Sequence, residues 1–542
     1  MKKQTKGILA FAFLGGLMLT SGVLIAIPGF DEDVDYAAMN DPEITITGTP
    51  ADTFPDDMRP IYCSSGNNAQ STDYVVEYLI STECTGPVGI VSDYDGNIWF
   101  TQSTTGSLGK FDPDTEIFSQ FPNKNWKMGE RSMMRGIDYA SDGSVWFTDD
   151  YNKLIWTFST INEKYNALEF PNDGKSLPQK LSVEGSQIIV NDFLGNKLTI
   201  FNINSDDSPA SALSIPSDVD DAFTGAFTLD TNDNIWYTNW IQNVGGILIN
   251  YDHENYRNDV LNFGEQFLPM NNYITTYPLP SQLLIPNGVA FSDDGTLWLS
   301  DSGTSFFFSF DPSTEQFIQY VTADPIFETY GNQTGIIGNP ISRPYAMEND
   351  DYGRLVFNEQ TGNNISVMDP KTQTLVEYQI PSKNPNWADC DSGMEVMENC
   401  GVAQILDFTI YGEKIWFTEW VENKIGVVDT SVPLPLEIQL EANTLNLKPG
   451  ESQEFEYVIS MNYQNDVSEL FLVASTTHDF LTASVLDASA DVVAIVDNSP
   501  EKIMIPTIIS TSDDALSGTY KILLGTQYGD ITISKYLTVI IE

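Results

Sequence analysis

The chain has 542 residues, with 25 basic against 76 acidic side chains and a formal net charge of −51. This charge repels nucleic acid phosphates and anionic lipid headgroups, so a nucleic acid partner is excluded. A hydrophobic share of 41% with 12% aromatic residues argues against disorder. The length indicates two or more domains, unless a repeat supplies one long modular core.

The N-terminus has the pattern of a membrane-targeting segment. Lys2, Lys3 and Lys6 precede an uncharged apolar stretch over residues 7–30, and acidic residues follow at 31–33. The stretch is about long enough to span a bilayer and lacks an Ala-x-Ala cleavage site. We therefore expect residues 1–30 to be an uncleaved single-pass anchor at the cell membrane, with the rest of the chain outside. A cleaved signal peptide and a secreted protein is the alternative, and residues 31–73 are expected to be a linker.

The chain has four cysteines, Cys63, Cys84, Cys390 and Cys400. An even number in an exported protein favours disulfides, and none of them has the close spacing of a zinc site. Pairing of Cys63 with Cys84 and of Cys390 with Cys400 is the simplest of three possible connectivities, although spacing alone does not decide between them.

A self-similar phrase recurs along the chain, for example GNIWFTQS at 96–103 and EKIWFTEW at 413–420. Seven copies are spaced 43 to 62 residues apart, which fits the period of propeller blades. Each phrase lies in a unit of four short strands, and its own strand is apolar at consecutive positions, which indicates burial on both faces. The equivalent marker positions are Trp99, Trp146, Ile189, Trp236, Trp298, Val356 and Trp416.

These repeats predict an all-β fold with a seven-bladed β-propeller over residues 74–432. The last blade lacks a fourth strand, whereas residues 74–80 resemble the fourth strands of other blades. We expect this N-terminal strand to complete the seventh blade and close the ring. The blade repeat ends before Leu436. From there about seven segments of alternating apolar and polar residues predict an immunoglobulin-like β-sandwich over residues 433–542. Its expected role is spacing, adhesion or assembly.

Two stretches carry a resemblance to a known family, GPVGIVSDYDGNIWFTQSTTGSLGKFDP at 86–113 and WFTEWVENKIGVVD at 416–429. They resemble the streptogramin lyase (virginiamycin B lyase) family of seven-bladed propellers. The resemblance implies magnesium binding and opening of a cyclic depsipeptide by elimination, with a His general base eleven residues before a marker. None of the matching positions holds His: they are Val88, Arg135, Pro178, Gly225, Asn287, Tyr345 and Ile405.

The two histidines of the chain lie elsewhere. His253 falls in an insertion between strands of the fourth blade, where we expect a surface loop, and His478 falls in the C-terminal domain. Whether the chain is an enzyme is therefore left open.

An oxygen-bearing side chain stands three residues after every marker. We expect this set to face one mouth of the central channel, where a divalent cation such as Mg²⁺ or Ca²⁺ could bind. The resemblance matches Glu359 and Glu419 to the family's metal position, and Asp301 is a third candidate ligand. The alternative is that these residues cap turns or face water. The full set is Gln102, Asp149, Asp192, Asn239, Asp301, Glu359 and Glu419.

Two arginines, Arg135 and Arg343, begin first strands and are also expected at this mouth, where they could hold a carboxylate or phosphate or only neutralise neighbouring acids. Insertions near 250–272, 322–341 and 382–402 are expected to crowd loops around the channel. The candidate ligand-binding residues are Arg135, Arg343, Asp149, Asn239, Asn287 and Tyr345.

Two functions remain open on this basis. The first is a non-catalytic binding or scaffold propeller at the cell surface, whose channel face takes a small molecule or a cell-surface protein. The second is a divalent-metal-dependent lyase or hydrolase that opens a cyclic ester or lactone.

Overall fold

The structure is a computed structural model. It describes residues 68–126, 133–171, 175–203, 209–216, 219, 221–242, 244–264, 268–325, 341–384, 400–462, 469–486, 492–494 and 502–542. The expected anchor, most of the expected linker, Cys63 and Cys390 lie outside these residues. Across the described ranges, no helix has both the length and the apolar character needed to cross a membrane.

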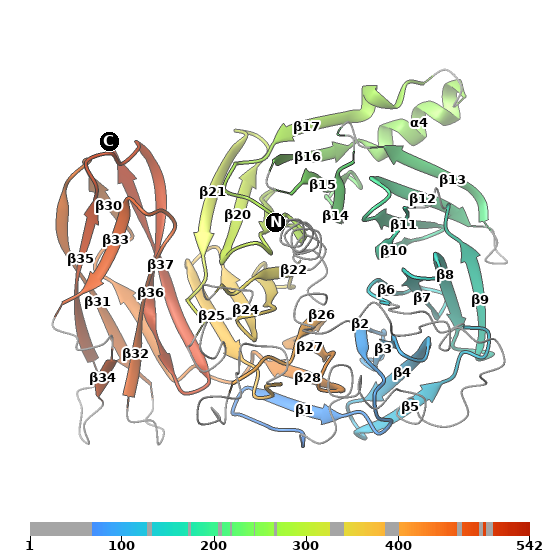
Figure 1. Cartoon of the computed structure of the whole chain (residues 1–542), viewed down its shortest axis with the longest axis horizontal. Coiled ribbons are helices and arrows are strands. Elements are labelled where there is room, and N and C mark those ends of the chain that lie inside the picture. The colour runs from blue at the N-terminus through green and yellow to red at the C-terminus, as the bar shows by residue number, and fades with distance from the viewer. Residues whose placement is uncertain are drawn as a thin grey trace, which may run out of the picture.

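Seven four-stranded antiparallel units surround a central channel as the blades of a β-propeller (Figure 1). The first blade consists of β2 (Pro87–Ser92), β3 (Ile98–Gln102), β4 (Ser107–Asp112) and β5 (Ile117–Phe121). The second consists of β6 (Ile137–Tyr139), β7 (Ser144–Asp149), β8 (Leu154–Ser159) and β9 (Lys164–Glu169). The third consists of β10 (Pro178–Glu184), β11 (Gln187–Asp192), β12 (Lys197–Ile203) and β13 (Pro209–Pro216). Blades four and five are β14 (Phe223–Leu229), β15 (Ile235–Ile241), β16 (Gly245–Tyr251) and β17 (Ile274–Pro278); and β18 (Val289–Phe291), β19 (Leu297–Ser300), β20 (Phe306–Asp311) and β21 (Gln316–Val321). Blades six and seven are β22 (Pro344–Asn349), β23 (Leu355–Glu359), β24 (Asn364–Asp369) and β25 (Thr374–Gln379); and β26 (Ile405–Tyr411), β27 (Lys414–Glu419), β28 (Lys424–Asp429) and β1 (Val75–Leu79).

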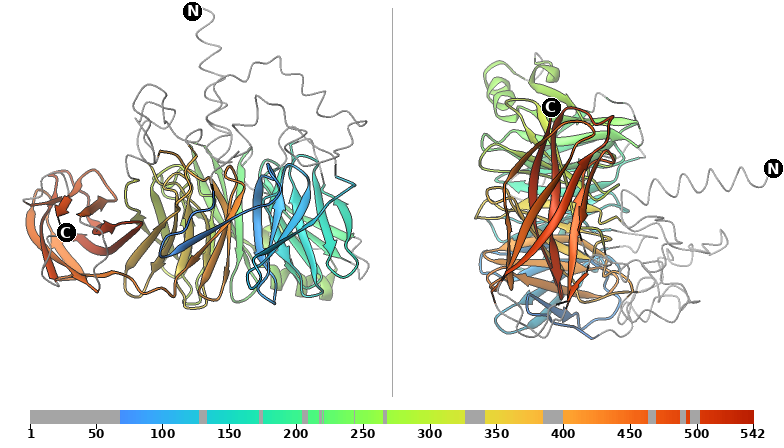
Figure 2. Two further views of the ribbon diagram at one scale, coloured as in Figure 1. Left: turned by 90° about the horizontal axis from the view of Figure 1, so that it is seen from below. Right: turned by 90° about the vertical axis from the view of Figure 1, so that its left-hand side faces the viewer.

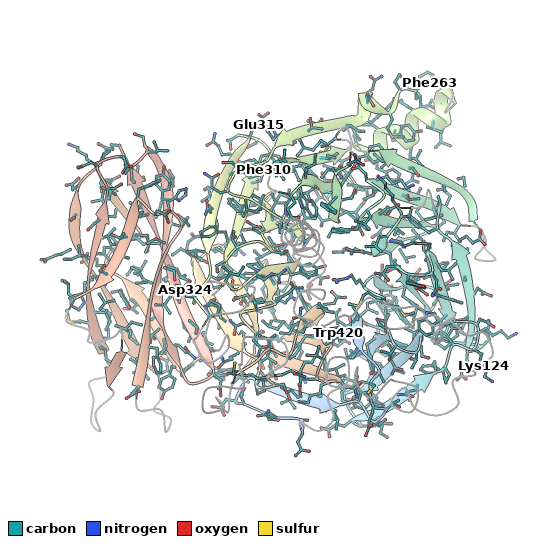
Figure 3. All side chains as sticks on the ribbon, in the orientation of Figure 1. Lys124, Phe263, Phe310, Glu315, Asp324 and Trp420 are labelled. Carbon is teal, nitrogen blue, oxygen red and sulfur yellow. The ribbon has the colours of Figure 1, made fainter. Side chains whose placement is uncertain are left out.

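The marker strands are buried on both faces, as their consecutive apolar residues predict. All residues of β3, β7, β19 and β23 are buried. Large side chains fill the spaces between neighbouring blades, as the stick view shows (Figure 3). Trp99, for example, packs on Phe121 of its own blade and on Phe158 of the next, with ring centroids 5.2 and 6.0 Å apart. This aromatic packing supplies the apolar burial that holds the ring together.

A polar side chain two residues after each marker links its blade to the next one. In the first blade, the Thr101 hydroxyl donates to the Met134 carbonyl of the second blade at 2.7 Å and accepts from the Gly89 amide at 2.9 Å. The pairing of β2 with β3 shifts register between Pro87 and Ile90, so the Gly89 amide has no strand partner there and donates to Thr101 and, at 3.1 Å, to the Met134 carbonyl. The corresponding bonds are Thr148 to Gln179 (2.6 Å), Asn191 to Gly225 (3.0 Å), Thr238 to Pro286 (2.6 Å), Ser300 to Tyr345 (2.6 Å), Asn358 to Ile405 (2.9 Å) and Thr418 to Val88 (2.6 Å).

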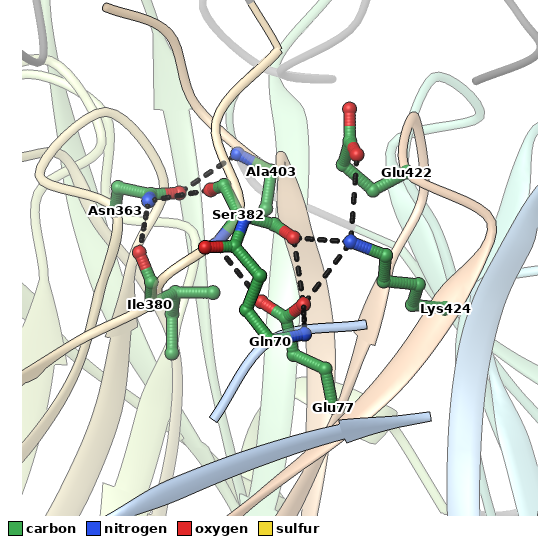
Figure 4. Close-up of polar contacts among 8 residues, drawn as sticks. All are labelled: Gln70, Glu77, Asn363, Ile380, Ser382, Ala403, Glu422 and Lys424. Carbon is green, nitrogen blue, oxygen red and sulfur yellow. Dashed lines mark hydrogen bonds and ion pairs between the residues drawn. The ribbon is translucent and has the colours of Figure 1, made fainter. Parts of the chain in front are cut away.

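Strand β1 pairs with β28, as residues 74–80 predict, and completes the four-stranded order β1-β28-β27-β26. A buried polar network fixes this strand (Figure 4). The Lys424 ammonium lies 3.0 Å from the Glu77 carboxylate, and both side chains are fully buried. Glu77 also accepts from the Ser382 amide at 2.8 Å and from the Ser382 hydroxyl at 2.7 Å, which ties β1 to the chain that follows the sixth blade. Lys424 Nζ donates to the same hydroxyl.

The C-terminal residues form a sandwich of two sheets beside the ring (Figure 2). The described strands number nine where about seven were expected, because the long predicted segments divide. They are β29 (Leu436–Leu440), β30 (Thr444–Leu447), β31 (Ser452–Met461), β32 (Glu469–Thr476), β33 (Leu481–Val485), β34 (Val492–Ala494), β35 (Lys502–Thr511), β36 (Gly518–Tyr528) and β37 (Ile531–Ile541). One sheet has the order β29-β31-β35-β33, and the other contains β37, β36, β32, β34 and β30.

The second sheet continues into the propeller. Strand β37 pairs antiparallel with β25, the outer strand of the sixth blade, so that blade and sheet form one nine-stranded sheet. Tyr536 is buried in this junction, where its hydroxyl donates to the Val321 carbonyl at 2.8 Å. The Lys521 ammonium donates to the Gln373 side chain at 2.6 Å. The sandwich is therefore joined to the ring by strand pairing, which the sequence analysis did not predict.

The insertion of the fourth blade is not a loop around the channel. It contains helix α4 (His253–Phe263) and the short 3-10 helix η3 (Met270–Tyr273), which lie at the outer rim of the ring (Figure 1). Phe263 at the end of α4 is labelled at this outer corner (Figure 3). Most of the other two insertions falls outside the described residues.

The Glu77 network gives a test of how the ring is closed. Replacing Lys424 with Met should lower the free energy of unfolding by about 3–5 kcal/mol, because Glu77 is left as a buried charge without its cation. Chemical denaturation of the parent and the variant measures this difference. Adding Glu77→Gln to Lys424→Met should recover most of the loss, and Lys164→Met at an exposed position is the matched control. An equal loss in the single and the double variant would contradict this account.

Candidate functional site

The central channel contains a cavity of about 640 Å³. Its walls come from the first strand of every blade, since these strands lie innermost in the ring. One lining residue from each first strand, in blade order, is Ile90, Asp138, Lys180, Thr228, Ala290, Glu348 and Asp407. These seven positions combine apolar wall segments with three carboxyl groups and one ammonium group, and the cavity is also lined by Asp293, Asp350, Asp351 and Arg135, which is the composition of a polar ligand site.

Two of the carboxyls are held in place by backbone amides of neighbouring blades. Asp407 accepts a hydrogen bond from the Ile90 amide of the first blade at 3.2 Å. Asp138 accepts one from the Val183 amide of the third blade at 2.7 Å. These bonds fix the two side chains against the channel wall.

The third carboxyl and the ammonium have no such fixation. Glu348 and Lys180 line the cavity, and neither side chain finds a hydrogen-bond partner within the described parts of the chain. Their charges still act on the two aspartates, so the four groups form one electrostatic cluster. We call Asp138, Lys180, Glu348 and Asp407 the channel cluster.

Burial raises the pKa of all three acids in the channel cluster. The pKa of Asp407 rises to about 8, chiefly through burial and then through the neighbouring charge of Glu348, while Lys180 opposes the rise. Burial likewise raises the pKa of Glu348. The positive charge of Lys180 opposes this rise, and the negative charge of Asp138 adds to it. The pKa of Asp138 is raised by burial against the stabilising effect of its backbone hydrogen bonds. At neutral pH the cavity thus contains at least one carboxyl that is largely protonated.

Three of the predicted ligand-binding residues do line the cavity: Arg135, Asn287 and Tyr345. The Arg135 guanidinium donates to the Tyr345 hydroxyl at 2.7 Å, across the channel from the second to the sixth blade. Asn287 donates to the Ser302 hydroxyl at 3.0 Å. These residues form a second polar group in the same cavity.

The other three predicted ligand-binding residues do not line it. Arg343 is buried with Nε donating to the Ser302 carbonyl at 2.9 Å, which joins the sixth blade to the fifth. Asp149 accepts from the Trp126 indole at 2.8 Å. Asn239 donates to the Thr224 hydroxyl at 2.9 Å. Each is engaged in a hydrogen bond within the protein and lies outside this cavity, and the ligand role expected of these three residues stays a prediction.

The polar set that follows the markers was expected at the channel mouth. All seven side chains are buried and none of them lines the cavity. Asp301, for example, accepts from the amides of Ile285 at 2.8 Å and Gly303 at 2.9 Å. The alternative of turn capping therefore describes Asp301.

The proposed metal ligands also do not meet. Asp301, Glu359 and Glu419 belong to three different blades and have separate surroundings. Glu359 accepts from the Ser366 hydroxyl and from Asn364 at 3.3 Å, and burial raises its pKa to about 7. Burial, followed by the charge of Glu77, raises the pKa of Glu419 well above its ordinary value. Within the residues that the structure describes, no three His, Cys, Asp or Glu side chains gather as a group that could hold Mg²⁺ or Ca²⁺.

Both histidines lie away from the cavity. His253 was expected to be a surface loop residue, but it is the buried first residue of α4. Its Nε2 lies 3.0 Å from the Gln187 amide oxygen. Burial lowers the pKa of His253 to about 4. His478 lies in the sandwich, where its Nδ1 is 2.9 Å from the Thr477 hydroxyl oxygen. Neither residue lines the cavity as a base.

Two of the four cysteines can be placed. Cys84 and Cys400 are buried and disulfide-bonded. Cys63 and Cys390 lie outside the described residues, so the pairing of Cys63 with Cys84 and of Cys390 with Cys400 stays a prediction.

The sequence analysis missed the channel cluster. A signal was present, because a charged residue interrupts the otherwise small or apolar first strands in GIDYA, QKLSV, AMEND and ILDFT. Comparing equivalent positions of the seven blades selected, as candidate site residues, the positions that are polar in every blade. A ligand site needs only a few blades to differ from the others, so the irregular positions were the informative ones.

Comparison with known proteins leaves the family open. No family model matches the chain, and no curated protein matches it. Among solved structures, it is similar to virginiamycin B lyase from Staphylococcus aureus, at 18% identity and a TM-score of 0.48, over 66% of this chain and 98% of that one. A streptogramin B lyase structure gives 19% identity and a TM-score of 0.47, over 65% of this chain and 96% of that one. The calcium-binding protein regucalcin from Agrobacterium tumefaciens gives 11% identity and a TM-score of 0.32, over 55% of this chain and 89% of that one. Likeness at these values gives no information about the activity of this chain.

The raised pKa of Asp407 predicts a pH dependence of stability. The folded state holds a proton on Asp407 between about pH 4 and pH 8, where the unfolded chain has lost it, so parent stability falls as pH rises through this window. Asp407→Asn removes this titration. Relative to the parent, the variant should gain stability between pH 5 and pH 8, by at most about 1.4 kcal/mol per pH unit. Denaturant titrations at four pH values measure the difference.

The control for this prediction is Asp112→Asn. Asp112 is a turn residue whose pKa is lowered by its hydrogen bond with Thr115, so its titration falls below the tested window. A stability difference between Asp407→Asn and the parent that stays constant from pH 5 to pH 8 would contradict the proposed state of Asp407.

Proposed function

We propose that this protein is a membrane-anchored, extracytoplasmic binding propeller that takes a small polar molecule into its central cavity. The observation that carries the proposal is the cavity itself, about 640 Å³ in volume and lined by the first strands of all seven blades. It is large enough for a small organic ligand. The sandwich, joined to the sixth blade through β37, then acts as a fixed extension of the binding domain.

The polar groups in the cavity support a binding role. One polar side chain of every blade is engaged in a bond to the next blade, whereas no hydrogen bond of the Glu348 or Lys180 side chain is found among the described residues. Groups without partners in a cavity have hydrogen-bonding capacity left for a ligand. A lyase or hydrolase that uses a divalent metal finds no ligand group of the expected kind in the described residues. Binding is therefore the function that the geometry supports best.

Blocking the cavity tests this function. Thr228 lines the cavity on the first strand of the fourth blade, and Thr228→Trp should fill much of the space beside it. In saturation-transfer NMR with a library of small polar compounds, the parent should bind a subset that Thr228→Trp binds at least about tenfold more weakly, a difference of about 1.4 kcal/mol. Thr519→Trp, at an exposed position of the sandwich, is the matched control. Library binding that is the same in all three proteins would contradict a role for the cavity.

The membrane anchor is the second part of the proposal. Its support is the uncharged apolar stretch at 7–30 with lysines before it and acids after it. We expect the mature protein to keep its N-terminus and to sediment with membranes, because about 24 apolar residues suffice to span a bilayer. Mass spectrometry of the purified full-length protein measures this. A mature mass that lacks the first 30 or so residues, with the protein in the soluble fraction, would instead support the secreted alternative.

A further inference from the structure

The charges of the channel cluster do not balance. Asp138, Glu348 and Asp407 are three carboxyls, and Lys180 is the single ammonium that acts on all of them. When all four groups are ionised, they carry a net charge of −2, which the other charged lining residues, Arg135 with Asp293, Asp350 and Asp351, do not offset. Burial is the main cause of the raised pKa values of the three acids, and the charge of Glu348 adds to it at Asp407.

A second observation indicates that the cluster faces a ligand site. Gln179, next to Lys180 in β10, is only 7% exposed and lines the same cavity. Its side-chain amide makes no hydrogen bond within the described residues, and neither amide atom is among the fully buried unpaired ones, so the amide is open to the cavity. The amide therefore has hydrogen-bonding capacity left for water or a ligand.

The arrangement of the carboxyls excludes a compact cation. They come from the second, sixth and seventh blades, so Asp138 lies on a different side of the channel from Glu348 and Asp407, which belong to neighbouring blades. Among the described residues the three do not gather as a group that could hold a metal ion. A metal ion needs its oxygen ligands at about 2.0–2.6 Å. A longer molecule with an ammonium at each end can instead reach carboxyls on separate walls.

The remaining wall suits an aliphatic chain. Ile90, Leu229 and Phe291, on the first strands of the first, fourth and fifth blades, line the same cavity and add apolar surface to its wall. Methylene groups packed there would lose contact with water, which favours binding. The cavity thus offers separated carboxyls for charged ends and apolar wall for the stem between them.

We infer that the cavity binds a short aliphatic diamine or polyamine, with one ammonium group at Glu348 and Asp407 on the neighbouring sixth and seventh blades, the other at Asp138 on the second blade, and its stem along the apolar wall. This inference rests on the proposed binding function and specifies the class of ligand. Ammonium groups donate up to three hydrogen bonds each, so one of them can also reach the Gln179 amide oxygen. Charge-assisted hydrogen bonds of this kind are about twice as strong as neutral ones.

The test compares putrescine with 1,4-butanediol, which has the same four-carbon stem without charge. Calorimetry on the full chain at physiological salt should show one putrescine site per chain and no binding of the diol under the same conditions. The double variant Glu348→Gln, Asp407→Asn should bind putrescine at least about tenfold more weakly. Its matched control is Asp114→Asn, Glu116→Gln, which removes the same charge from an exposed turn and should bind like the parent.

The outcomes separate this inference from the proposed function. Putrescine binding that is equal in the parent and in both double variants would reflect the −51 surface and would overturn the inference. No putrescine binding at all would overturn it as well. If library compounds without an amine bind in a manner that Thr228→Trp abolishes, the cavity function stands although the diamine inference fails. If Thr228→Trp binds the whole library like the parent, both the proposed cavity function and the diamine inference that rests on it fail.

Discussion

The ring depends on one recurrent hydrogen bond, from the side chain two residues after each marker to a backbone carbonyl of the next blade. Shape complementarity between apolar faces does not fix the height or rotation of one blade against another, since apolar contact is not directional. The directional bond from Thr101 to Met134 does so, together with the hydrogen bond that the Gly89 amide donates to the same carbonyl at 3.1 Å. The same contact from Thr418 to Val88 joins the last blade to the first, so the ring is linked by one geometry throughout.

This bond also explains which parts of the structure the sequence could predict. A strand buried on both faces must be apolar at consecutive positions, and the marker phrase of each blade displays this directly. The pairing of residues 74–80 with the seventh blade followed from counting strands, and β1 does pair with β28. The position of the polar set beyond each marker could not be deduced in the same way. Whether Asp301 turns to the channel or under a loop depends on the backbone path after the strand, which the repeat pattern does not encode.

The channel cluster and the sandwich junction escaped prediction for related reasons. The first strands contain register shifts, as between Ile405 and Phe408, so the simple alternation of a strand does not tell which residues face the channel. The junction between β25 and β37 joins residues more than 150 positions apart, and its ladder is made by backbone groups, which any sequence with strand propensity can supply. What marks it in the sequence is only the amphipathic character of β37, and that is equally consistent with an edge strand inside the sandwich.

The junction has a consequence for how the protein presents its cavity. An edge strand offers unpaired backbone groups, and pairing with β25 satisfies those of β37 on that side. Buried contacts such as Tyr536 with Val321 add side-chain constraints to the same seam. Because both parts share one sheet, a rotation of the sandwich requires breaking ladder hydrogen bonds, in contrast to the free rotation that a flexible linker would allow. The sandwich therefore has a defined orientation to the channel axis (Figure 2).

The channel cluster itself shows a conflict between stability and function. Asp138 and Asp407 each accept an amide hydrogen bond from the next blade, a task that an asparagine oxygen would perform without the cost of burying a charge. Placing carboxyls there, with Glu348 between them in the electrostatic network, lowers stability at neutral pH, as the raised pKa of Asp407 indicates. A channel built for stability alone would use amides or apolar side chains at these positions. The carboxyls are best explained by a cation that occupies the cavity in the working state, since its charge would convert an unfavourable cluster into a matched one.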